Sequence, residues 1–215
     1  MSLRRPPTIS RPALAARPAL AARAALAAAG ILAALCPGRD AAAQPAVADA
    51  ALAFTIADDA LSLEAPAGWK RVQPKSNMIE TEFSIPATAG DTAPGRMTVM
   101  GAGGSVQANI DRWYGQFTQP DGSATKDKAS TKKLNVSGSV VTLVDVSGTY
   151  KDMPGGPFAG GQAVDRPDYR MLAAIVELPE RGSYFLKFYG PSATVSANAD
   201  GFRKMVEGMV PAAAK

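Results

Sequence analysis

The sequence predicts an α+β fold in which an antiparallel β-sheet carries helices on both faces. Residues 171–178 form a short and almost wholly apolar run, which is typical of a strand covered on both faces. A turn signal at residues 180–182 separates this run from an alternating run at residues 183–189, so the two should pair as an antiparallel hairpin. Only two segments show helical spacing, and strands with hairpins between them predominate elsewhere. This combination indicates an α+β domain.

Residues 1–43 have the three parts of a secretory signal peptide. Residues 1–23 are rich in arginine and contain no acid, and residues 24–35 are an unbroken apolar run. Ala41-Ala42-Ala43 fits the small-x-small cleavage pattern, so we expect cleavage before Gln44. As a helix the apolar run would span about 18 Å, less than the bilayer core of about 30 Å. The expected product is a periplasmic or secreted protein with no transmembrane span in the mature chain.

Three alternatives to simple secretion are open at the sequence level. Cys36 could accept a lipid, but Leu35 stands where a small residue normally precedes such a cysteine. Arg4-Arg5 could begin a twin-arginine signal, although Pro6-Pro7 fits that motif poorly, so the export route stays open. A transit peptide is the third alternative, and the unbroken apolar run together with the cleavage site argues against it.

Composition and charge exclude several classes of function. The net charge of +4 belongs to the leader, whose six arginines and one aspartate leave the rest of the chain near neutral. A near-neutral domain presents no electrostatic footprint for nucleic acid. The chain has no histidine, and its one cysteine, Cys36, would leave with the leader. Nucleophile systems built on Ser-His or Cys-His and histidine-ligated zinc are therefore excluded from the mature domain, and we expect neither metal nor cofactor.

The first half of the mature chain reads as strands and turns. We expect residues 44–60 to be an N-terminal extension with a first strand, and residues 61–211 to be a single domain. Residues 54–56 and 61–63 flank a short turn and should form a small hairpin. A turn is expected at Pro66-Ala67-Gly68, directly before the large aromatic residue Trp69. Further strands are expected at residues 78–85, which alternate, and at residues 97–100.

The first helix is predicted after Ser105, a good N-cap residue. Its apolar face should bury Trp113, which we interpret as a fold residue. That face consists of Val106, Ile110, Trp113 and Phe117 at helical spacing. The residues expected off this face are Asn109, Asp111, Arg112 and Gln116.

The second half continues with strands at residues 134–136 and 140–150, joined at Ser137-Gly138. A charged loop or edge is expected before them at residues 124–133. Residues 151–167 read as a long glycine- and proline-rich loop, either a flexible connection or a lid over a site. After the hairpin, Gly190-Pro191 ends the strand. One long helix then begins near Val195, with its apolar positions at Val195, Phe202, Met205, Val206 and Met209.

Several short motifs resemble a secreted bacterial family of unknown function, similar in architecture to the PsbP/Mog1 superfamily. The likeness covers about residues 61–210. The motifs that carry it are Pro66-Ala67-Gly68-Trp69, Phe83-Ser84-Ile85-Pro86, the run 109–117 around Arg112-Trp113, Tyr169-Arg170-Met171-Leu172 and the run 184–191 that ends in Gly-Pro. The resemblance implies an α-β-α sandwich and a binding role, because characterised members of the superfamily bind other proteins. It carries over no catalytic residues.

The candidate binding residues are Arg112, Gln116, Tyr169 and Arg170. The first two flank Trp113 and could form a polar patch, or could be ordinary solvated helix residues. The other two belong to a motif of the resemblance. Glu80 and Glu82 lie two residues apart on a predicted strand, with side chains about 7 Å apart on one face, and paired carboxylates can act as acid and base.

The sequence therefore favours an exported, non-enzymatic module that binds another envelope protein. The alternative is a periplasmic small-ligand or carbohydrate-binding domain, which could be a carboxylate-dependent hydrolase using Glu80 and Glu82. A concave site lined by these carboxylates and by aromatic residues would favour the alternative. A flat, exposed apolar patch would favour protein binding.

Overall fold

The computed structural model describes residues 52–154 and 162–213 of the 215-residue chain, and all of them belong to one compact unit, Pro45–Lys215. The predicted leader, its cleavage site and Cys36 lie outside the described residues, as does most of the glycine-rich loop. In the part of the chain that is described, no helix is long and apolar enough to cross a membrane.

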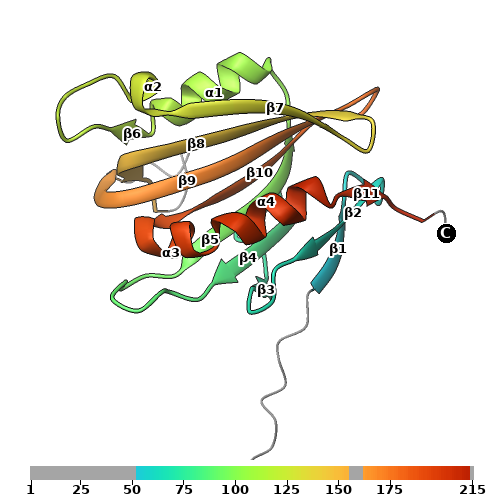
Figure 1. Ribbon diagram of the computed structural model, residues 1–215, viewed down its shortest axis with the longest axis horizontal. Coiled ribbons are helices and arrows are strands. Elements are labelled where there is room, and N and C mark those ends of the chain that lie inside the picture. Colours follow the sequence, from blue (N-terminus) through green and yellow to red (C-terminus); the bar gives the residue numbers. More distant parts are fainter. Residues whose placement is uncertain (1–51, 155–161, 214–215) are drawn as a thin grey trace, which may run out of the picture. The chain divides into compact units, whose positions relative to one another are not determined.

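The main sheet has eight strands within the described ranges, and every pairing in it is antiparallel. Its order is β3-β4-β5-β10-β9-β8-β6, with β7 also paired to β8 (Figure 1). The strands are β3 (Lys70–Val72), β4 (Thr81–Ile85), β5 (Gly95–Ala102), β6 (Phe117–Thr118), β7 (Ser130–Val136), β8 (Ser139–Asp152), β9 (Val164–Leu178) and β10 (Gly182–Pro191). The predicted antiparallel α+β fold is confirmed.

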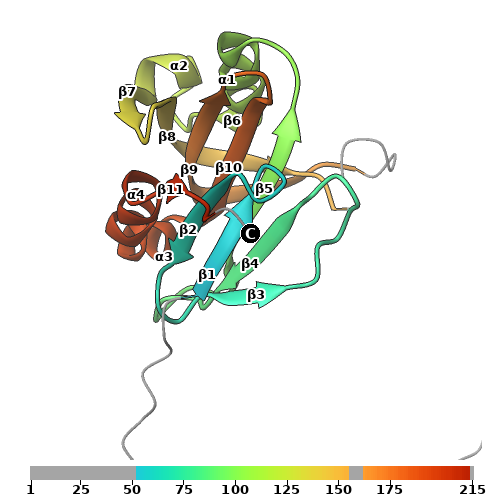
Figure 2. The ribbon, with the colours of Figure 1, turned by 90° about the vertical axis from the view of Figure 1, so that its right-hand side faces the viewer.

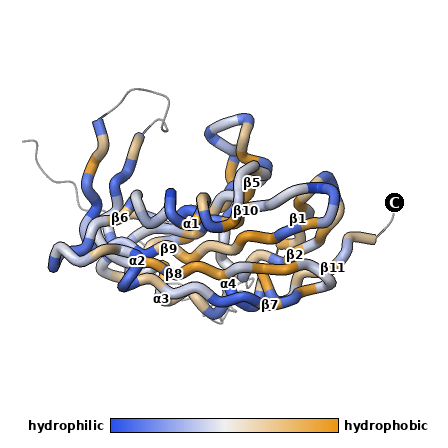
Figure 3. The backbone as a smooth tube through the Cα atoms, turned by 90° about the horizontal axis from the view of Figure 1, so that it is seen from above, coloured by the Kyte–Doolittle hydropathy of each residue, from blue (hydrophilic) through white to orange (hydrophobic). Residues whose placement is uncertain are grey.

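Strand β9 lies between β8 and β10 and is covered on both faces, as its apolar run predicted. Its side chains alternate between two cores. Met171, Ala173 and Ile175 belong to one, and Leu172, Ala174 and Val176 to the other. Hydrophobic stretches of the strands gather in the interior, whereas β7 is mostly hydrophilic (Figure 3). The predicted hairpin with β10 forms, with Gly182 opposite Leu178.

Helices cover the two faces of the main sheet (Figure 1). Helix α1 (Val106–Tyr114) packs on the face that carries Met171 and Phe185, with the short helix α2 (Thr125–Lys128) beside it. Helices α3 (Ser192–Ala197) and α4 (Ala199–Glu207) pack on the other face, where Val195 and Phe202 enter the larger core. We refer below to these as the α1 face and the α4 face.

A small sheet of three strands, β1-β2-β11, shares the α4 face (Figure 2). Strand β1 (Leu52–Ile56) pairs with β2 (Leu61–Ala65), which confirms the predicted N-terminal hairpin. Strand β11 (Val210–Pro211), near the end of the chain, adds to β2. Phe54 and Leu63 from this sheet pack in one core with Phe83 and Phe202.

The C-terminal helix differs from the prediction, because two helices stand where one was expected. The chain turns at Asn198, whose φ of −104° and ψ of 4° leave the helical geometry. The Asn198 amide nitrogen donates to the Thr194 carbonyl at 2.9 Å, and its oxygen accepts from Trp69 Nε1 at 2.9 Å. The break therefore supplies the buried indole of Trp69 with its hydrogen-bond partner. All the predicted apolar positions are nevertheless buried.

Helix α1 begins as predicted, with the Ser105 hydroxyl accepting from the Ala108 amide at 3.2 Å. It ends at Tyr114, with Gly115 as its C-cap, so Phe117 enters the core from β6 rather than from the helix. Asn109 was predicted off the apolar face but is buried. Its amide nitrogen donates to the carbonyls of Gly103 and Ser105, at 3.2 and 2.9 Å. These bonds give the buried side-chain amide of Asn109 its hydrogen-bond partners at the start of α1.

Strand ends also differ from the sequence analysis. The strand predicted at residues 78–85 begins only at Thr81. The region read as a loop from residue 151 contributes to both β8 and β9, with Lys151 opposite Asp165. Of the segment expected as a charged loop or edge, residues 130–133 belong to β7, an edge strand paired to β8, and residues 125–128 form helix α2. Strands β3, β6 and β11 were not predicted. Segments of two or three residues have too few positions to show a period, and β6 and β11 also pair with strands distant in sequence.

Candidate functional site

A group of aromatic and polar side chains gathers on the α1 face, beyond the C-terminal end of α1. We call Gln116, Tyr150, Tyr169, Lys187 and Tyr189 the tyrosine–lysine cluster. Its members come from the loop after α1, from β8, from β9 and from β10. Because side chains alternate along a strand, Lys187 and Tyr189 share the face of Phe185, whose ring meets the indole of Trp113 edge-on at 5.7 Å.

Lys187 is the centre of this cluster. Its Nζ donates to Gln116 Oε1 at 2.6 Å and lies 4.7 and 5.2 Å from the ring centroids of Tyr189 and Tyr150. The Tyr150 ring also stacks on Tyr169, with centroids 6.0 Å apart and planes 7° apart. A cation over aromatic faces is attracted by their negative charge density. The lysine is therefore held in one position by two rings and an amide.

Arg96 extends the cluster to the neighbouring strands β5 and β4. Its Nη1 donates to the Tyr189 hydroxyl at 2.7 Å, and its Nε and Nη2 donate to the two oxygens of Glu82 at 2.8 and 2.9 Å. Burial alone would raise the pKa of Glu82, but the hydrogen bonds from Arg96 and from the Lys75 amide outweigh it and hold the pKa below its ordinary value. Glu82 is thus an ionised, buried anchor for Arg96.

The charge of Lys187 is disfavoured where it stands. Burial, followed by the nearby guanidinium groups of Arg96 and Arg112, lowers the pKa of Lys187 from 10.5 to about 7, while Asp152 opposes the shift. Burial likewise raises the pKa of Tyr150, so its hydroxyl keeps its proton. Near neutral pH the lysine is therefore poised between its charged and neutral forms.

We expect this lysine to make the stability of the protein depend on pH. In the unfolded chain the amine binds its proton up to about pH 10.5, so between pH 7 and that value the unfolded state binds more protons than the folded state. Stability should therefore rise with pH from 7 to 9, and Lys187→Met should remove this rise and raise the melting temperature at pH 6. Thermal melts of wild type and variant across pH 6–9 measure both effects.

A matched control is Lys204→Met, on the exposed side of α4. Its melting temperature should follow wild type at every pH. Parallel pH curves for wild type and Lys187→Met would show that Lys187 keeps an ordinary pKa. The titratable groups that act on Lys187 in this comparison are Arg96, Arg112, Tyr150, Asp152 and Tyr189. Behind them, Glu82 is bonded to Arg96 and Tyr169 is stacked on Tyr150.

The structure brings three of the four predicted binding residues to this region. Gln116 and Tyr169 belong to the cluster, and Arg112 lies close enough to influence the charge of Lys187. Arg112 is exposed on α1, and its Nη2 donates to the Asn109 side-chain oxygen. Arg112 and Gln116, interpreted from the sequence as a polar patch beside Trp113, therefore lie next to Lys187.

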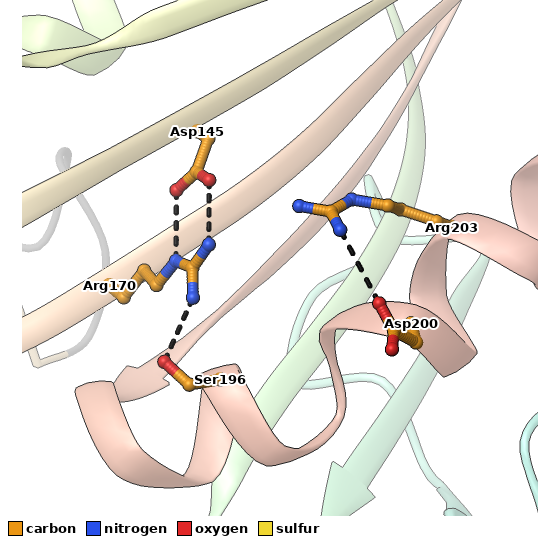
Figure 4. A network of polar contacts seen from close by, with 5 residues as sticks. All are labelled: Asp145, Arg170, Ser196, Asp200 and Arg203. Atoms are coloured by element: carbon orange, nitrogen blue, oxygen red, sulfur yellow. Dashed lines mark hydrogen bonds and ion pairs between the residues drawn. The ribbon is translucent and has the colours of Figure 1, made fainter.

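Arg170 lies elsewhere. It follows Tyr169 on β9 and so points to the α4 face, where it forms two hydrogen bonds with Asp145, at 2.9 and 2.7 Å (Figure 4). A third bond, of 2.8 Å, runs from Nη1 to the Ser196 hydroxyl of α3. Arg170 thus joins β9, β8 and α3 on the face opposite the cluster.

The two carboxylates Glu80 and Glu82 do not share a site, which corrects the sequence analysis. Glu80 precedes β4 and lies beside the turn at Ala57 and Asp58, where burial raises its pKa. Glu82 is on the strand and is paired with Arg96. Within the described ranges, no group of three or more histidine, cysteine, aspartate or glutamate side chains is arranged to hold a metal ion.

Two cavities lie away from the cluster. One, of about 260 Å³, lies between β8 and α4 and is lined partly by Leu143, Leu172 and Phe202. The other, of about 320 Å³, lies between α1 and β7. Neither is lined by residues of the tyrosine–lysine cluster, in which Tyr150 is buried and the other four side chains are half-buried.

Sequence reasoning missed Arg96, Tyr150, Lys187 and Tyr189 as site residues. A signal was present for Lys187, because it interrupts an otherwise aromatic face of the alternating run 183–189. A lone lysine in such a run is as readily explained by a solvated edge strand. Only the pairing of β10 between β5 and β9 places it among the tyrosines.

No family model and no curated protein matches the chain. Among solved structures, the chain is similar to the PsbP protein (CyanoP) of Synechocystis sp. PCC 6803. The identity is 9%, the match covers 81% of this chain and 99% of that one, and the TM-score is 0.47. It is also similar to LpqN of Mycobacterium tuberculosis, a protein involved in cell envelope biogenesis. There the identity is 10%, the coverage is 76% and 91%, and the TM-score is 0.46.

Proposed function

We propose that the protein is an exported, non-enzymatic accessory module that binds another envelope protein. The contact surface is the tyrosine–lysine cluster together with Arg112. The leader of residues 1–43, with its arginine-rich start, apolar run and small-residue cleavage pattern, supports the export. Cleavage near Ala43 gives a periplasmic or secreted protein with no lipid at Cys36.

The observation that carries this proposal is the gathering of three tyrosines, a lysine and an arginine at one open end of the α1 face. Tyrosine and arginine are enriched at the centres of protein interfaces and dominate their binding energy. Gln116, Tyr169, Lys187 and Tyr189 are half-buried, so part of each remains open to a partner. Hydrogen bonds and ring stacking hold these side chains in place before binding, which reduces the entropy lost on association.

The alternative, a small-ligand or carbohydrate-binding domain, rests on the cavity between β8 and α4. Lys132 and Arg203 line this cavity together with apolar residues. Its volume of about 260 Å³ falls below the range of about 300–1,000 Å³ that is typical of ligand pockets, and the cavity between α1 and β7, at about 320 Å³, lies at the lower end of that range. A carboxylate-dependent hydrolase would need Glu80 and Glu82 in one site, and the two side chains instead have separate surroundings.

Site-specific photo-crosslinking tests the proposal. A benzophenone amino acid replaces Tyr169 in the full chain, expressed with its leader, and irradiated cells are fractionated. The expected result is a discrete adduct with an envelope protein. The matched control places the same residue at Tyr184, which is also half-buried but lies on the α4 face.

The pattern of adducts decides between the outcomes. An adduct from position 169 that is absent from position 184, and that weakens when Arg112→Gln is added, supports the proposal. Identical adducts from both positions, or none from either, would contradict it. Retention of the protein in the cytoplasmic fraction would contradict the export.

A further inference from the structure

We propose that the tyrosine–lysine cluster and Arg112 recognise a carboxylate on an acidic side chain of the bound protein. This inference rests on the proposed protein-binding role of the same surface and names the chemistry that the surface selects. Three cationic groups converge there, from β5, α1 and β10, and two of them have no carboxylate partner among the described residues.

Arg96 is the group that is already neutralised. Its two bonds to Glu82 and its bond to the Tyr189 hydroxyl occupy Nε, Nη1 and Nη2. Its guanidinium carbon also lies 5.9 Å from the Tyr189 ring centroid. Arg96 therefore orients Tyr189 but adds no free charge to the surface.

Lys187 has unused hydrogen-bonding capacity. An ammonium group has three protons to donate, and the described residues offer Lys187 one oxygen acceptor, Gln116 Oε1. The ring faces of Tyr150 and Tyr189 attract the cation, but they do not accept a conventional hydrogen bond from it. An incoming carboxylate oxygen would supply the missing acceptor.

Arg112 is the second unpaired cation. Among the residues that the structure describes it forms no ion pair, and its one hydrogen bond goes to the neutral side chain of Asn109. The nearby carboxylate of Asp152 is bonded to Arg166 at 3.2 Å. Arg112 is also exposed, so an external group can reach it.

Burial is the main cause of the lowered pKa of Lys187, and repulsion from Arg96 and Arg112 adds to it; one negative charge between Arg112 and Lys187 would offset that repulsion. Arginine donates two parallel bonds that match the geometry of a carboxylate, and charge-assisted bonds are the stronger class. A carboxylate offers two acceptor oxygens and a compensating negative charge, whereas a neutral amide offers one acceptor oxygen and no charge. The surface is therefore expected to distinguish glutamate from glutamine.

The test uses blocked hexapeptides of glutamate and of glutamine as probes of the purified protein, with amide chemical shifts followed by NMR. The glutamate peptide should bind and shift the amides around Gln116, Tyr169 and Lys187, and the glutamine peptide should leave them unmoved. Lys187→Met and Arg112→Gln should each weaken glutamate binding about five- to tenfold, as expected for loss of one charge-assisted bond. Lys204→Gln, on α4, should bind as wild type does.

Two results would overturn the inference. One is equal binding of the two peptides, or glutamate binding that survives both cluster substitutions. The other is occupation of the same amides by inorganic phosphate at lower concentration than the glutamate peptide, which would assign the surface to a phosphate-bearing group.

The outcome separates this inference from the proposed function. If the crosslink at position 169 forms but glutamate peptides do not bind, the protein-binding role stands and the carboxylate preference fails. If glutamate peptides bind but no crosslink forms, the anion site stands and the proposed envelope partner fails.

Discussion

Trp113→Ala is expected to lower the free energy of unfolding by about 3–5 kcal/mol, a large part of the typical 5–15 kcal/mol of a domain. The indole is 4% exposed and packs with Ile110 and edge-on against Phe185. Its removal leaves a cavity under a nine-residue helix, and a helix of that length is marginal in water without such packing. Urea or guanidinium unfolding at neutral pH measures the loss.

The matched control is Gln107→Ala, an exposed position on the same helix whose side chain bonds only to Asp111. It should change the unfolding free energy by less than about 0.5 kcal/mol. If Trp113→Ala unfolds at the wild-type denaturant concentration, α1 is held by other contacts, and Trp113 would have to be reconsidered as part of the binding surface.

Arg96→Met should be almost as costly, at about 3 kcal/mol near pH 7. Glu82, whose side chain is 2% exposed, would remain buried without its cation, and breaking a buried ion pair from one side typically costs about 3–5 kcal/mol. We expect the lower end of that range because the Arg96 side chain is 28% exposed. Denaturant unfolding of wild type and variant at pH 7 and pH 4 gives the size and the pH dependence of the loss.

The sign of that pH dependence follows from the pKa of Glu82. In wild type this pKa is held below its ordinary value, so the stabilisation is present above the unfolded value of 4.5 and is lost as pH falls through the folded value. In Arg96→Met the buried carboxylate should instead take up a proton readily, so the deficit relative to wild type should shrink between pH 7 and pH 4. The double variant Glu82→Gln with Arg96→Met should recover much of the loss, and a double variant no more stable than Arg96→Met would contradict the pairing.

The arrangement of Tyr169 and Arg170 shows the limit of what neighbouring positions in the sequence reveal. Both belong to one motif and were named among the candidate binding residues, yet they lie on opposite faces of β9. Alternation along a strand is a local rule, and it could have separated the two residues had the strand been predicted to begin at Val164. The glycine and proline content of the preceding segment instead indicated a loop as far as Pro167.

The sequence by itself determined the elements whose evidence is local. The period of apolar residues identified the β9–β10 hairpin, the buried stripe of α1 with Trp113, and the buried positions from Val195 to Met209. These patterns repeat every two or every 3.6 residues, so they can be read within a short window. The antiparallel α+β class followed from the order of the strands and helices identified in this way.

Only the tertiary structure decided which residues form the site. Tyr150, Tyr169 and Tyr189 lie on three strands, and Gln116 and Arg96 on two further segments, so their proximity depends on the order β5-β10-β9-β8 and on the register of each pair. A shift of one residue in any register would move Lys187 or its neighbours to the other face. The same pairing buried Asn109, joined Glu82 to Arg96 and separated Glu80 from Glu82. These contacts arise between segments far apart in the chain, where local periodicity carries no information about which strands will meet.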